Sequence, residues 1–583
     1  MLLRKEAVLS TFRIGINMAG AVSAGAYTAG VLDFLTEALD EWYKAKARGE
    51  VVPPHDVSLE VLSGASAGGM CAAISAVMLQ EGFDHIHDPS RRNTNNRFYE
   101  SWVNRIDIKE LLKTDDLPTG SPVVSLLDSS IIRSIAEYAL TPGVAGLGAR
   151  RWLSPSLTLF LSLTNLRGTP YSLNGVAPGS IEETTFFFGD RIRFQTGSSA
   201  GVAPHAHALD FTQPGAAGGW DVLQIAAMAT GAFPVFLAPR VLGRHLGEYT
   251  PPPWESVAAA VTGTPPPVSP TFPPGTPDPL RTLNVDGGVT NNDPFNYAHD
   301  YLAALSPARL SGPPTSPVEA DRAVIGVAPF PSTEKFDTAF DPVRSSGVFS
   351  VLGRLFSALI SQSRFFGEHL DLVMSGRTFD RFVIAPSDDS LAQRYAGLHP
   401  GAQPPALQCA ALSAFGGFFF RGFRAHDYAL GRRNCQKFLA TSFLLPQDNA
   451  VMKAALDPLP PAMRGEIVAK FGKPAPRAYD RSAMPQPSSP AADFWLPVVP
   501  LCTSELAAPI PRIDRAVMTA ADLDPILDLI LGRFKAVVAA LLATVSSKPL
   551  RFFLTVGQPA IRFLLRRPLR DKLISELGDA YKP

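Results

Sequence analysis

The strongest chemical signal in the sequence is a serine between two glycines. Gly64-x-Ser66-x-Gly68 lies between a short apolar strand pattern, residues 57–62, and an apolar helical stretch that ends near residue 79. In such a turn the glycines permit a sharp bend that lifts the hydroxyl out of the sheet edge, and the following helix N-terminus favours negative charge. We therefore predict that Ser66 is a nucleophile.

The same pattern occurs a second time around Ser199, in residues 197–201 (Gly-Ser-Ser-Ala-Gly). This copy meets Pro204 within three residues, and no apolar helix follows it. A strand before the motif and a helix after it give the motif its meaning. The context therefore favours Ser66 and predicts a loop around Ser199.

A serine nucleophile also needs a base. Asp286, in residues 284–288 (Asn-Val-Asp-Gly-Gly), ends a predicted strand, where parallel α/β sheets collect functional groups. A carboxylate there could accept the Ser66 proton directly, without a histidine. The alternative is that Asp286-Gly287 only forms a turn, the commonest reason for an Asp-Gly pair.

The third requirement is a set of donors for the oxyanion. Residues 20–25 (Gly-Ala-Val-Ser-Ala-Gly) join the first predicted strand to the first predicted helix. Backbone N–H groups of Gly20, Ala21 and Val22 could point at a developing alkoxide. A plain connection between strand and helix is the alternative.

Histidines offer two other kinds of site. Residues 205–207 (His-Ala-His) and 85–88 (His-Ile-His-Asp) could bind a metal, but neither has a third ligand at helical spacing, so a loop without metal is favoured. His299 follows Asp286 by thirteen residues and could complete a Ser-His-Asp triad of an α/β-hydrolase. It falls in a predicted helix, which favours a structural histidine. We expect no metal and no organic cofactor.

The elements that position these residues alternate between strand and helix. Residues 12–18 predict a strand, residues 27–42 carry apolar side chains at helical spacing, and residues 57–62 predict the next strand before the helix that follows Ser66. This alternation predicts an α/β architecture with a largely parallel sheet. Residues 84–150 are predicted to be an insertion.

Composition limits the partners. The 583 residues contain 53 Lys and Arg against 53 Asp and Glu, so no net charge would hold the protein on nucleic acid. Proline is abundant, with 54 in all and eleven in residues 251–280, which predicts an extended loop over 250–280 and a possible rim or lid of the site.

The compartment is inferred from the cysteines and the termini. Four scattered cysteines favour a reducing compartment, and charges interrupt both the N-terminal apolar stretch and residues 523–545. We therefore expect a cytoplasmic protein with neither a signal peptide nor a transmembrane helix.

Residues 548–572 contain seven basic residues against one acid, so this tail could lie on an anionic bilayer as a peripheral contact. Short helices packed on the catalytic domain are the alternative.

Five blocks in this order resemble the patatin-like phospholipase family. They are the loop at residues 20–25, the turn at Ser66, residues 163–168 (Leu-Thr-Asn-Leu-Arg-Gly), residues 229–234 (Ala-Thr-Gly-Ala-Phe-Pro) and residues 286–294 with their Asp-Gly-Gly. Residues 415–439 are similar to the C-terminal part of the longer bacterial patatin-related proteins.

The resemblance implies a three-layer α/β/α fold with a mostly parallel central sheet, followed by a C-terminal helical region. It also implies a Ser-Asp dyad that hydrolyses acyl esters of phospholipids or other lipids, of phospholipase A or lysophospholipase type, through an acyl-enzyme. Ser66 would be the nucleophile and Asp286 the base. Motif glycines would be Gly64, Gly68, Gly287 and Gly288.

One departure separates this chain from that family. The family loop is usually Gly-rich with a cation, as G-G-G-x-[RK]-G, whereas residues 20–25 keep only Gly20 and Gly25 and contain no basic residue. A non-catalytic lipid- or protein-binding module on the same fold is therefore an alternative. For the domain organisation we expect a catalytic domain over 8–450, a Pro-rich linker over 451–500 and helices over 501–583.

Overall fold

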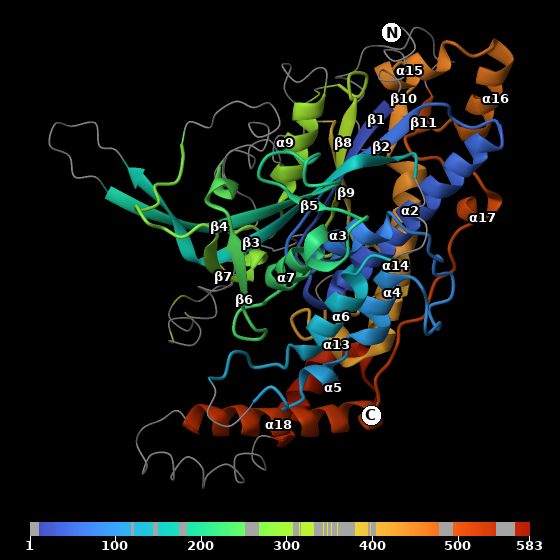
Figure 1. Cartoon of the computed structure of the whole chain (residues 1–583). Coiled ribbons are helices and arrows are strands. Elements are labelled where there is room, and N and C mark those ends of the chain that lie inside the picture. The colour runs from blue at the N-terminus through green and yellow to red at the C-terminus, as the bar shows by residue number, and fades with distance from the viewer. Residues whose placement is uncertain are drawn as a thin grey trace.

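A central sheet organises the molecule, and its nine described strands all come from the N-terminal two thirds of the chain (Figure 1). The computed structural model describes residues 11–582 outside the gaps 118–121, 144–149, 174–182, 251–267, 307–313, 315, 331–341, 343–346, 348–350, 352–357, 359–378, 395–396, 398–403, 477–493 and 544–565. Its strands are β1 Thr11–Met18, β2 Asp56–Gly64, β3 Leu153–Leu173, β4 Glu183–Thr196, β5 His207–Leu209, β6 Arg240–Arg244, β7 Leu280–Asp286, β8 Arg322–Val327, β9 Arg381–Ile384, β10 Leu444–Pro446 and β11 Trp495–Pro497.

The strand order is β5-β4-β3-β2-β1-β8-β9, with β7 paired to β3 and β6 paired to β7. Neighbours from β3 to β9 run parallel, whereas β4 and β7 both run antiparallel to β3. Chain order reverses beside β1, because β2 and β3 lie on one side of it and β8 and β9 on the other. Such a switch point opens a crevice at the carboxyl ends of the strands. The loop after β1 and the turn after β2 both lie at this edge.

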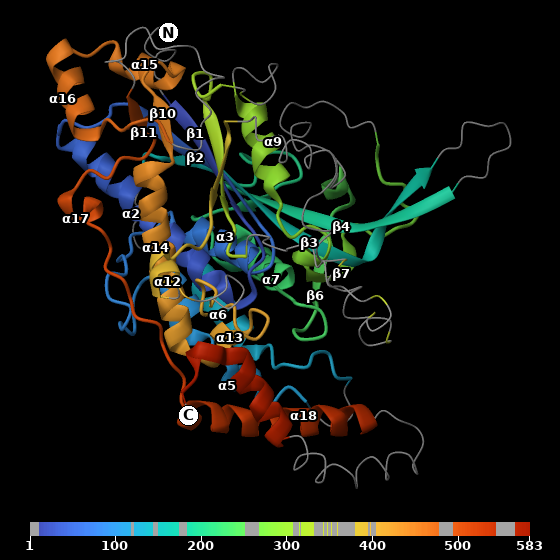
Figure 2. The same ribbon diagram turned by 180° about the vertical axis from the view of Figure 1, so that it is seen from behind.

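Helices cover both faces of the sheet (Figures 1 and 2). Helix α9 packs on one face, where its apolar side chains form a cluster with β2, β3 and β8. Helices α2, α3 and α7 pack on the other face in the main core. The three-layer α/β/α fold with a mostly parallel sheet is therefore confirmed. The helices are α2 Gly25–Ala47, α3 Ala67–Met78, α4 Arg97–Tyr99, α5 Ile108–Leu111, α6 Ser130–Leu140, α7 Trp220–Thr230, α9 Phe295–Leu305, α12 Asp389–Arg394, α13 Gly416–Phe419, α14 Arg421–Thr441, α15 Ala450–Leu456, α16 Pro461–Phe471, α17 Ser504–Ala507 and α18 Ala520–Ala543.

Helix α14 lies along α2, although nearly 400 residues of chain separate them (Figures 1 and 2). Glycines permit this contact: a Cβ on Gly30 would meet the Tyr428 carbonyl oxygen at 1.9 Å, and a Cβ on Gly431 would meet the Tyr27 oxygen at 2.2 Å. Residues of the C-terminal third, far from β1 and β2 in sequence, therefore belong to the same core.

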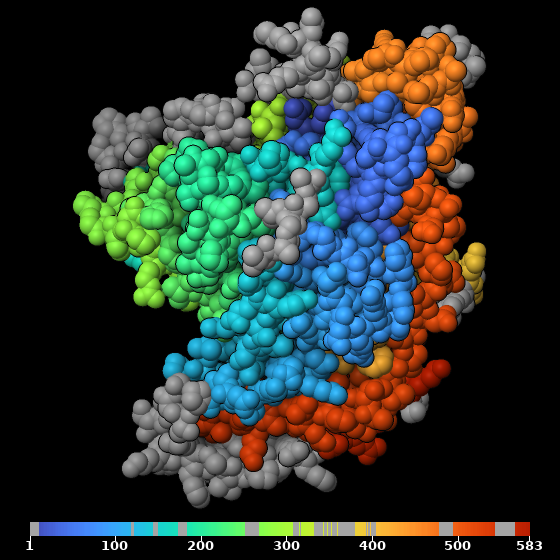
Figure 3. Space-filling view, turned by 45° about the vertical axis from the view of Figure 1, so that its right-hand side comes forward, coloured from blue at the N-terminus to red at the C-terminus, as the bar shows by residue number. Residues whose placement is uncertain are grey.

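The prediction of a Pro-rich linker over residues 451–500 is wrong for much of that range. Helices α15 and α16 occupy its first part and bury Met452, Ile467 and Phe471 in the main core, while β11 pairs with β10 near its end. Residues 477–493 lie outside the described part. The space-filling view shows the segments after residue 450 packed closely against the N-terminal half (Figure 3). The boundaries near 450 and 500 therefore do not divide the core.

The basic tail is described over residues 566–582. Arg566 and Arg570 pair with Asp528 and Asp524 of α18, and Leu573 is buried in the main core. Over these residues the tail packs on α18.

Residues 544–565 lie outside the described part, and so do residues 251–267 of the proposed lid. No helix among the described residues combines the length and the apolar character that a bilayer span requires.

A buried ion cluster joins α2 to α14. Arg432 binds Asp33 and binds Glu37 at 2.6 Å. Burial alone would raise the pKa of Asp33, but Arg432 and His85 lower it far below its ordinary value. The cluster is thus charged at neutral pH, and its charges depend on one another.

Arg432→Met should destabilise the protein by about 3–5 kcal/mol, because it leaves two buried carboxylates without their cation. Urea unfolding at neutral pH measures this loss. Lys437→Met, on the same helix, removes an exposed pair with Asp389 and should change stability by less than about 1 kcal/mol. Equal effects of the two substitutions would contradict this account of the α2–α14 contact.

Candidate active site

Ser66 occupies the sharp turn between β2 and α3. Its backbone has φ 54° and ψ −130°, a left-handed φ that costs energy for a residue with a side chain. The flanking glycines make the turn possible: a Cβ on Gly64 would meet the Gly68 carbonyl carbon at 2.6 Å, and a Cβ on Gly68 would meet the Met18 oxygen at 2.1 Å. The turn thus presents the hydroxyl at the carboxyl edge of the sheet.

The Ser66 hydroxyl donates a hydrogen bond to Asp286. Ser66 Oγ lies 2.7 Å from Asp286 Oδ2, and the Gly288 N–H donates to Asp286 Oδ1 at 2.7 Å. Asp286 is 3% exposed and Ser66 is 8% exposed. β7, the strand that ends at Asp286, runs antiparallel to β3. Asp286 therefore approaches the carboxyl edge of the sheet from the direction opposite to that of the parallel strands.

Burial raises the pKa of Asp286 to about 7, although the hydrogen bonds from Ser66 and from the Gly288 N–H both lower it. A carboxyl group with a pKa near neutrality can both accept and release a proton at that pH. The electrostatics therefore suit a general base without any histidine.

Two threonines hold the backbones of this pair. Thr230 Oγ1 accepts a hydrogen bond from the Ser66 N–H at 3.1 Å and donates to the Ser162 carbonyl at 2.7 Å. Thr164 Oγ1 donates to the Asp286 carbonyl at 2.8 Å. Sequence analysis singled out the blocks around both threonines without giving them a role. Their role depends on contacts between segments far apart in sequence.

The loop after β1 lies directly against the serine. A Cβ on Gly20 would meet Asn292 Oδ1 at 2.0 Å and the Ser66 Cβ at 3.2 Å. However, the Gly20 N–H donates to the Asn292 carbonyl at 3.0 Å, which corrects the expectation that it is an oxyanion donor. Val22 has a left-handed φ of 47°. Among the described residues, none accepts a hydrogen bond from the N–H of Ala21 or Val22, which leaves both donors available.

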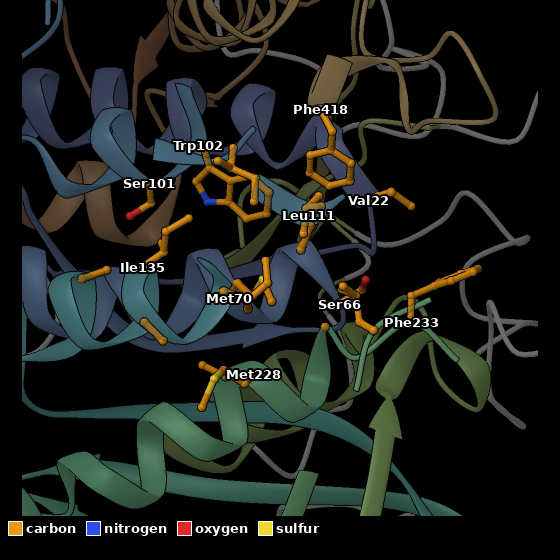
Figure 4. Close-up of a pocket in the computed structure, with 18 of the residues that line it drawn as sticks. Val22, Ser66, Met70, Ser101, Trp102, Leu111, Ile135, Met228, Phe233 and Phe418 are labelled. Atoms are coloured by element: carbon orange, nitrogen blue, oxygen red, sulfur yellow. The ribbon is translucent and has the colours of Figure 1, made fainter. Parts of the chain in front are cut away.

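A deep apolar pocket begins at Ser66 (Figure 4). Val22 and Phe233 flank the serine, while Trp102 and Ile135 line the pocket further from it. The lining residues other than Ser66 and Ser101 are apolar: Val22, Ala67, Met70, Ile74, Trp102, Ile106, Leu111, Leu127, Ile132, Ile135, Ala136, Ala139, Leu140, Ala227, Met228, Gly231, Phe233, Leu237, Phe415 and Phe418. Many belong to the predicted insertion, which therefore builds a wall of the pocket.

The other sequence candidates lie elsewhere. Ser199 lies in an exposed turn. The ring nitrogens of His299 lie 3.1 Å from Asp300 and 3.1 Å from Asp380, so its hydrogen bonds go to these carboxylates and not to Ser66. His85 and His87 contact Asp33 and Glu37 of α2. No three His, Cys, Asp or Glu side chains gather as a metal-binding group in the described ranges.

Sequence reasoning missed the part of the site that comes from the C-terminal third. Phe415 and Phe418 line the pocket. Ser23, in the loop after β1, donates through its N–H and its hydroxyl to the Ala414 carbonyl at 3.2 and 2.5 Å. The likeness of residues 415–439 to longer bacterial proteins was the available signal, but it carried no information about contact.

Asp286→Asn should stabilise the protein at alkaline pH. Because the folded-state pKa of Asp286 is about 7, above the ordinary value near 3.9, wild-type stability falls as pH rises between the two values. The variant should be more stable by about 2–4 kcal/mol at pH 8, with the difference vanishing near pH 4. Urea unfolding at both pH values measures it. A variant less stable than wild type at pH 8 would exclude a strained, buried carboxylate.

Comparison with known proteins identifies the family of the chain. A family model described as patatin-like phospholipase matches residues 17–299, which include the loop after β1, the turn at Ser66 and Asp286. An uncharacterized protein of Sinorhizobium fredii (strain NBRC 101917 / NGR234), y4iI, is 32% identical over 615 residues, covering 97% of this chain and 82% of that protein. This likeness extends through the C-terminal third. The chain belongs to the patatin-like phospholipase family.

Proposed function

We propose that this protein is a serine lipid acyl hydrolase of phospholipase A or lysophospholipase type. The observation that carries the proposal is the 2.7 Å hydrogen bond from Ser66 Oγ to a buried Asp286 at the mouth of an apolar pocket. A nucleophile, its base and a binding site for a hydrocarbon chain thus meet at one point. Membership of the patatin-like phospholipase family supports lipid acyl hydrolysis as the general type of reaction.

In the first step Ser66 attacks the ester carbonyl while Asp286 accepts the hydroxyl proton. The 2.7 Å contact is within the range for direct proton transfer. Negative charge develops on the carbonyl oxygen, and the N–H groups of Ala21 and Val22 stabilise it. Asp286 then returns the proton to the leaving alcohol, and the acyl group stays on Ser66.

In the second step water releases the acyl group. Asp286, again unprotonated, accepts a proton from water, and the resulting hydroxide attacks the acyl carbonyl. The same amides stabilise the second oxyanion. Ser66 leaves and recovers its proton from Asp286, which restores the resting hydrogen bond.

The pocket indicates the substrate class. Its apolar walls can bury a hydrocarbon chain, and each buried methylene contributes about 0.8 kcal/mol. Because the pocket begins beside Ser66, the chain that occupies it belongs to the acyl group under attack. Acyl esters of lipids fit this arrangement better than short, polar esters.

Ser66→Ala and Asp286→Asn should each lower kcat by at least about 10³-fold, because each removes one partner of the proton transfer. Hydrolysis of p-nitrophenyl esters and of phosphatidylcholine vesicles measures the loss, and thermal unfolding at or above the wild-type temperature shows that the fold persists. Wild type should form a fluorophosphonate adduct at Ser66, identified by mass spectrometry.

Ser199→Ala is the matched control, since Ser199 has the same flanking pattern in an exposed turn. It should keep wild-type activity. Full activity of Ser66→Ala or Asp286→Asn would rule out the dyad. A folded wild-type protein that forms no adduct would favour a non-catalytic binding module.

Ala139→Leu should shift chain-length preference. Ala139 lines the pocket one helical turn along α6 from Ile135, and Ile135 lies away from Ser66 (Figure 4), so added volume at Ala139 reduces the space for a long chain. We expect kcat/KM to fall by about 10-fold or more for palmitoyl esters and to stay unchanged for butyryl esters. Ser134→Leu adds comparable bulk on the exposed side of α6 and should change neither value. Equal losses for both esters would contradict the acyl-chain assignment.

A further inference from the structure

Arg424 of α14 is a buried cation, and all of its side-chain hydrogen bonds to described residues go to backbone carbonyls. It is 1% exposed. Its guanidinium donates to Val103 at 3.2 and 3.0 Å, to Gly417 at 2.6 Å and to Phe418 at 3.3 Å. Within the described ranges, no carboxylate lies at ion-pair distance from it. Burial lowers the pKa of Arg424 to about 10, so the group is still charged at neutral pH. Burying a charge in this way is expensive.

The four carbonyl contacts join two walls of the pocket. Val103 follows Trp102 in a π-helix, Glu100–Arg105, that comes from the predicted insertion. Gly417 and Phe418 belong to α13, from the C-terminal third. Because Trp102 and Phe418 both line the pocket, the rigid fork of the guanidinium fixes one wall relative to the other.

The same helix α13 also holds the loop after β1. The Gly417 N–H donates to Ser23 Oγ at 3.0 Å, across a separation of 394 residues. A Cβ on Gly417 would meet Ser23 Oγ at 2.6 Å, so only glycine allows this approach. Ser23 in turn donates to the Ala414 carbonyl through both its N–H and its hydroxyl. The residue that directly follows Val22 is thus held at two points by residues 414–417.

Residues on both sides of the contact between Ser23 and residues 414–417 have a strained, left-handed backbone. Leu412, Ser413 and Ala414 have φ values of 54°, 54° and 72°, and Val22 has 47°. Left-handed backbone costs roughly 1–2 kcal/mol for each residue with a side chain. Such strain persists where surrounding contacts over-determine the backbone, and it concentrates at functional sites. Here the hydrogen bonds of Ser23 with Ala414 and Gly417 supply such contacts, and Arg424 binds the Gly417 carbonyl in turn.

We propose that Arg424 is a positioning residue of the active site, which acts through Gly417 and Ser23 to fix the oxyanion donors Ala21 and Val22. The inference rests on the proposed function. The loop between Gly20 and Gly25 contains no basic residue. The C-terminal third provides a cation, Arg424, which binds Gly417, and Gly417 in turn binds Ser23 of the loop. The segment that matches the family model is then incomplete as a catalyst without residues 414–424.

A misplaced oxyanion donor lowers the rate of the chemical step more than it weakens ground-state binding. Loss of an oxyanion-hole donor costs about 10²–10³ in kcat in other hydrolases, so a loosened one should cost less. The expected signature is therefore a fall in kcat with little change in KM.

The test uses Arg424→Lys and Ser23→Ala in the full chain with p-nitrophenyl butyrate, which places few methylenes in the pocket. The first keeps the charge but removes the fork, and the second removes the hydroxyl that binds Gly417 and Ala414. Each should lower kcat by about 10- to 100-fold with KM changed by less than about threefold. Fluorophosphonate labelling of Ser66 should slow by a similar factor.

Arg421→Lys is the matched control on the same helix. Arg421 also donates to backbone and side-chain oxygens of the insertion, at Arg91 and Asn104, but none of its side-chain hydrogen bonds within the described part of the chain goes to Gly417. It should leave kcat unchanged, and thermal unfolding of all three variants shows whether the fold persists.

The inference is overturned if folded Arg424→Lys and Ser23→Ala keep wild-type kcat, if only KM rises, or if Arg421→Lys loses as much kcat as they do. Should Arg424→Lys fail to fold, Ser23→Ala decides the question alone. A wild-type protein that neither hydrolyses esters nor forms the fluorophosphonate adduct would instead refute the proposed function, and the inference with it.

Discussion

A carboxyl group buried beside a serine is the constraint on which the rest of the site depends. Asp286 is 3% exposed, and the donors recorded for its carboxyl oxygens are the Ser66 hydroxyl and the Gly288 N–H. No cation among the described residues forms an ion pair with it. Burial therefore raises its pKa to about 7, and the same burial that destabilises the charged form raises the proton affinity of the carboxylate. Burying the carboxyl group costs free energy, so the surrounding structure must hold Ser66 and Asp286 in place. Thr230 and Thr164 contribute by binding the backbones of these two residues.

The surrounding structure brings together segments from most of the chain. β1, β2 and β7 supply the loop, the serine and the aspartate, and the predicted insertion supplies one wall of the pocket. Another wall includes Phe415 and Phe418, which lie beyond the residues that match the family model. Helix α14, packed along α2 with the close approach that Gly30 and Gly431 allow, carries this wall into place. The C-terminal third is thus part of the same core and the same pocket.

Where sequence reasoning failed, the physical causes are specific. Proline content predicted a linker over 451–500, yet Pro461 lies in the first turn of α16, where its missing N–H costs nothing and its fixed φ suits a helix. Proline density therefore did not distinguish a loop from a helix start. Gly20 was expected to donate to an oxyanion, but its N–H binds the Asn292 carbonyl, from a segment that the local pattern does not contain. The strand of Asp286 was predicted, but its antiparallel direction depends on pairing with β3.

The sequence by itself determined the features that depend on neighbouring residues. Alternating strand and helix patterns predicted the α/β sheet, and Gly64 and Gly68 marked the turn at which Ser66 adopts a left-handed φ. Tertiary structure alone decided the distance from Ser66 to Asp286, the pKa of that carboxyl group and the contact of Ser23 with Gly417. These depend on how much solvent is excluded and on which distant segments meet. Both are properties of the packed chain, because burial and long-range contact are summed over many residues and leave no local pattern.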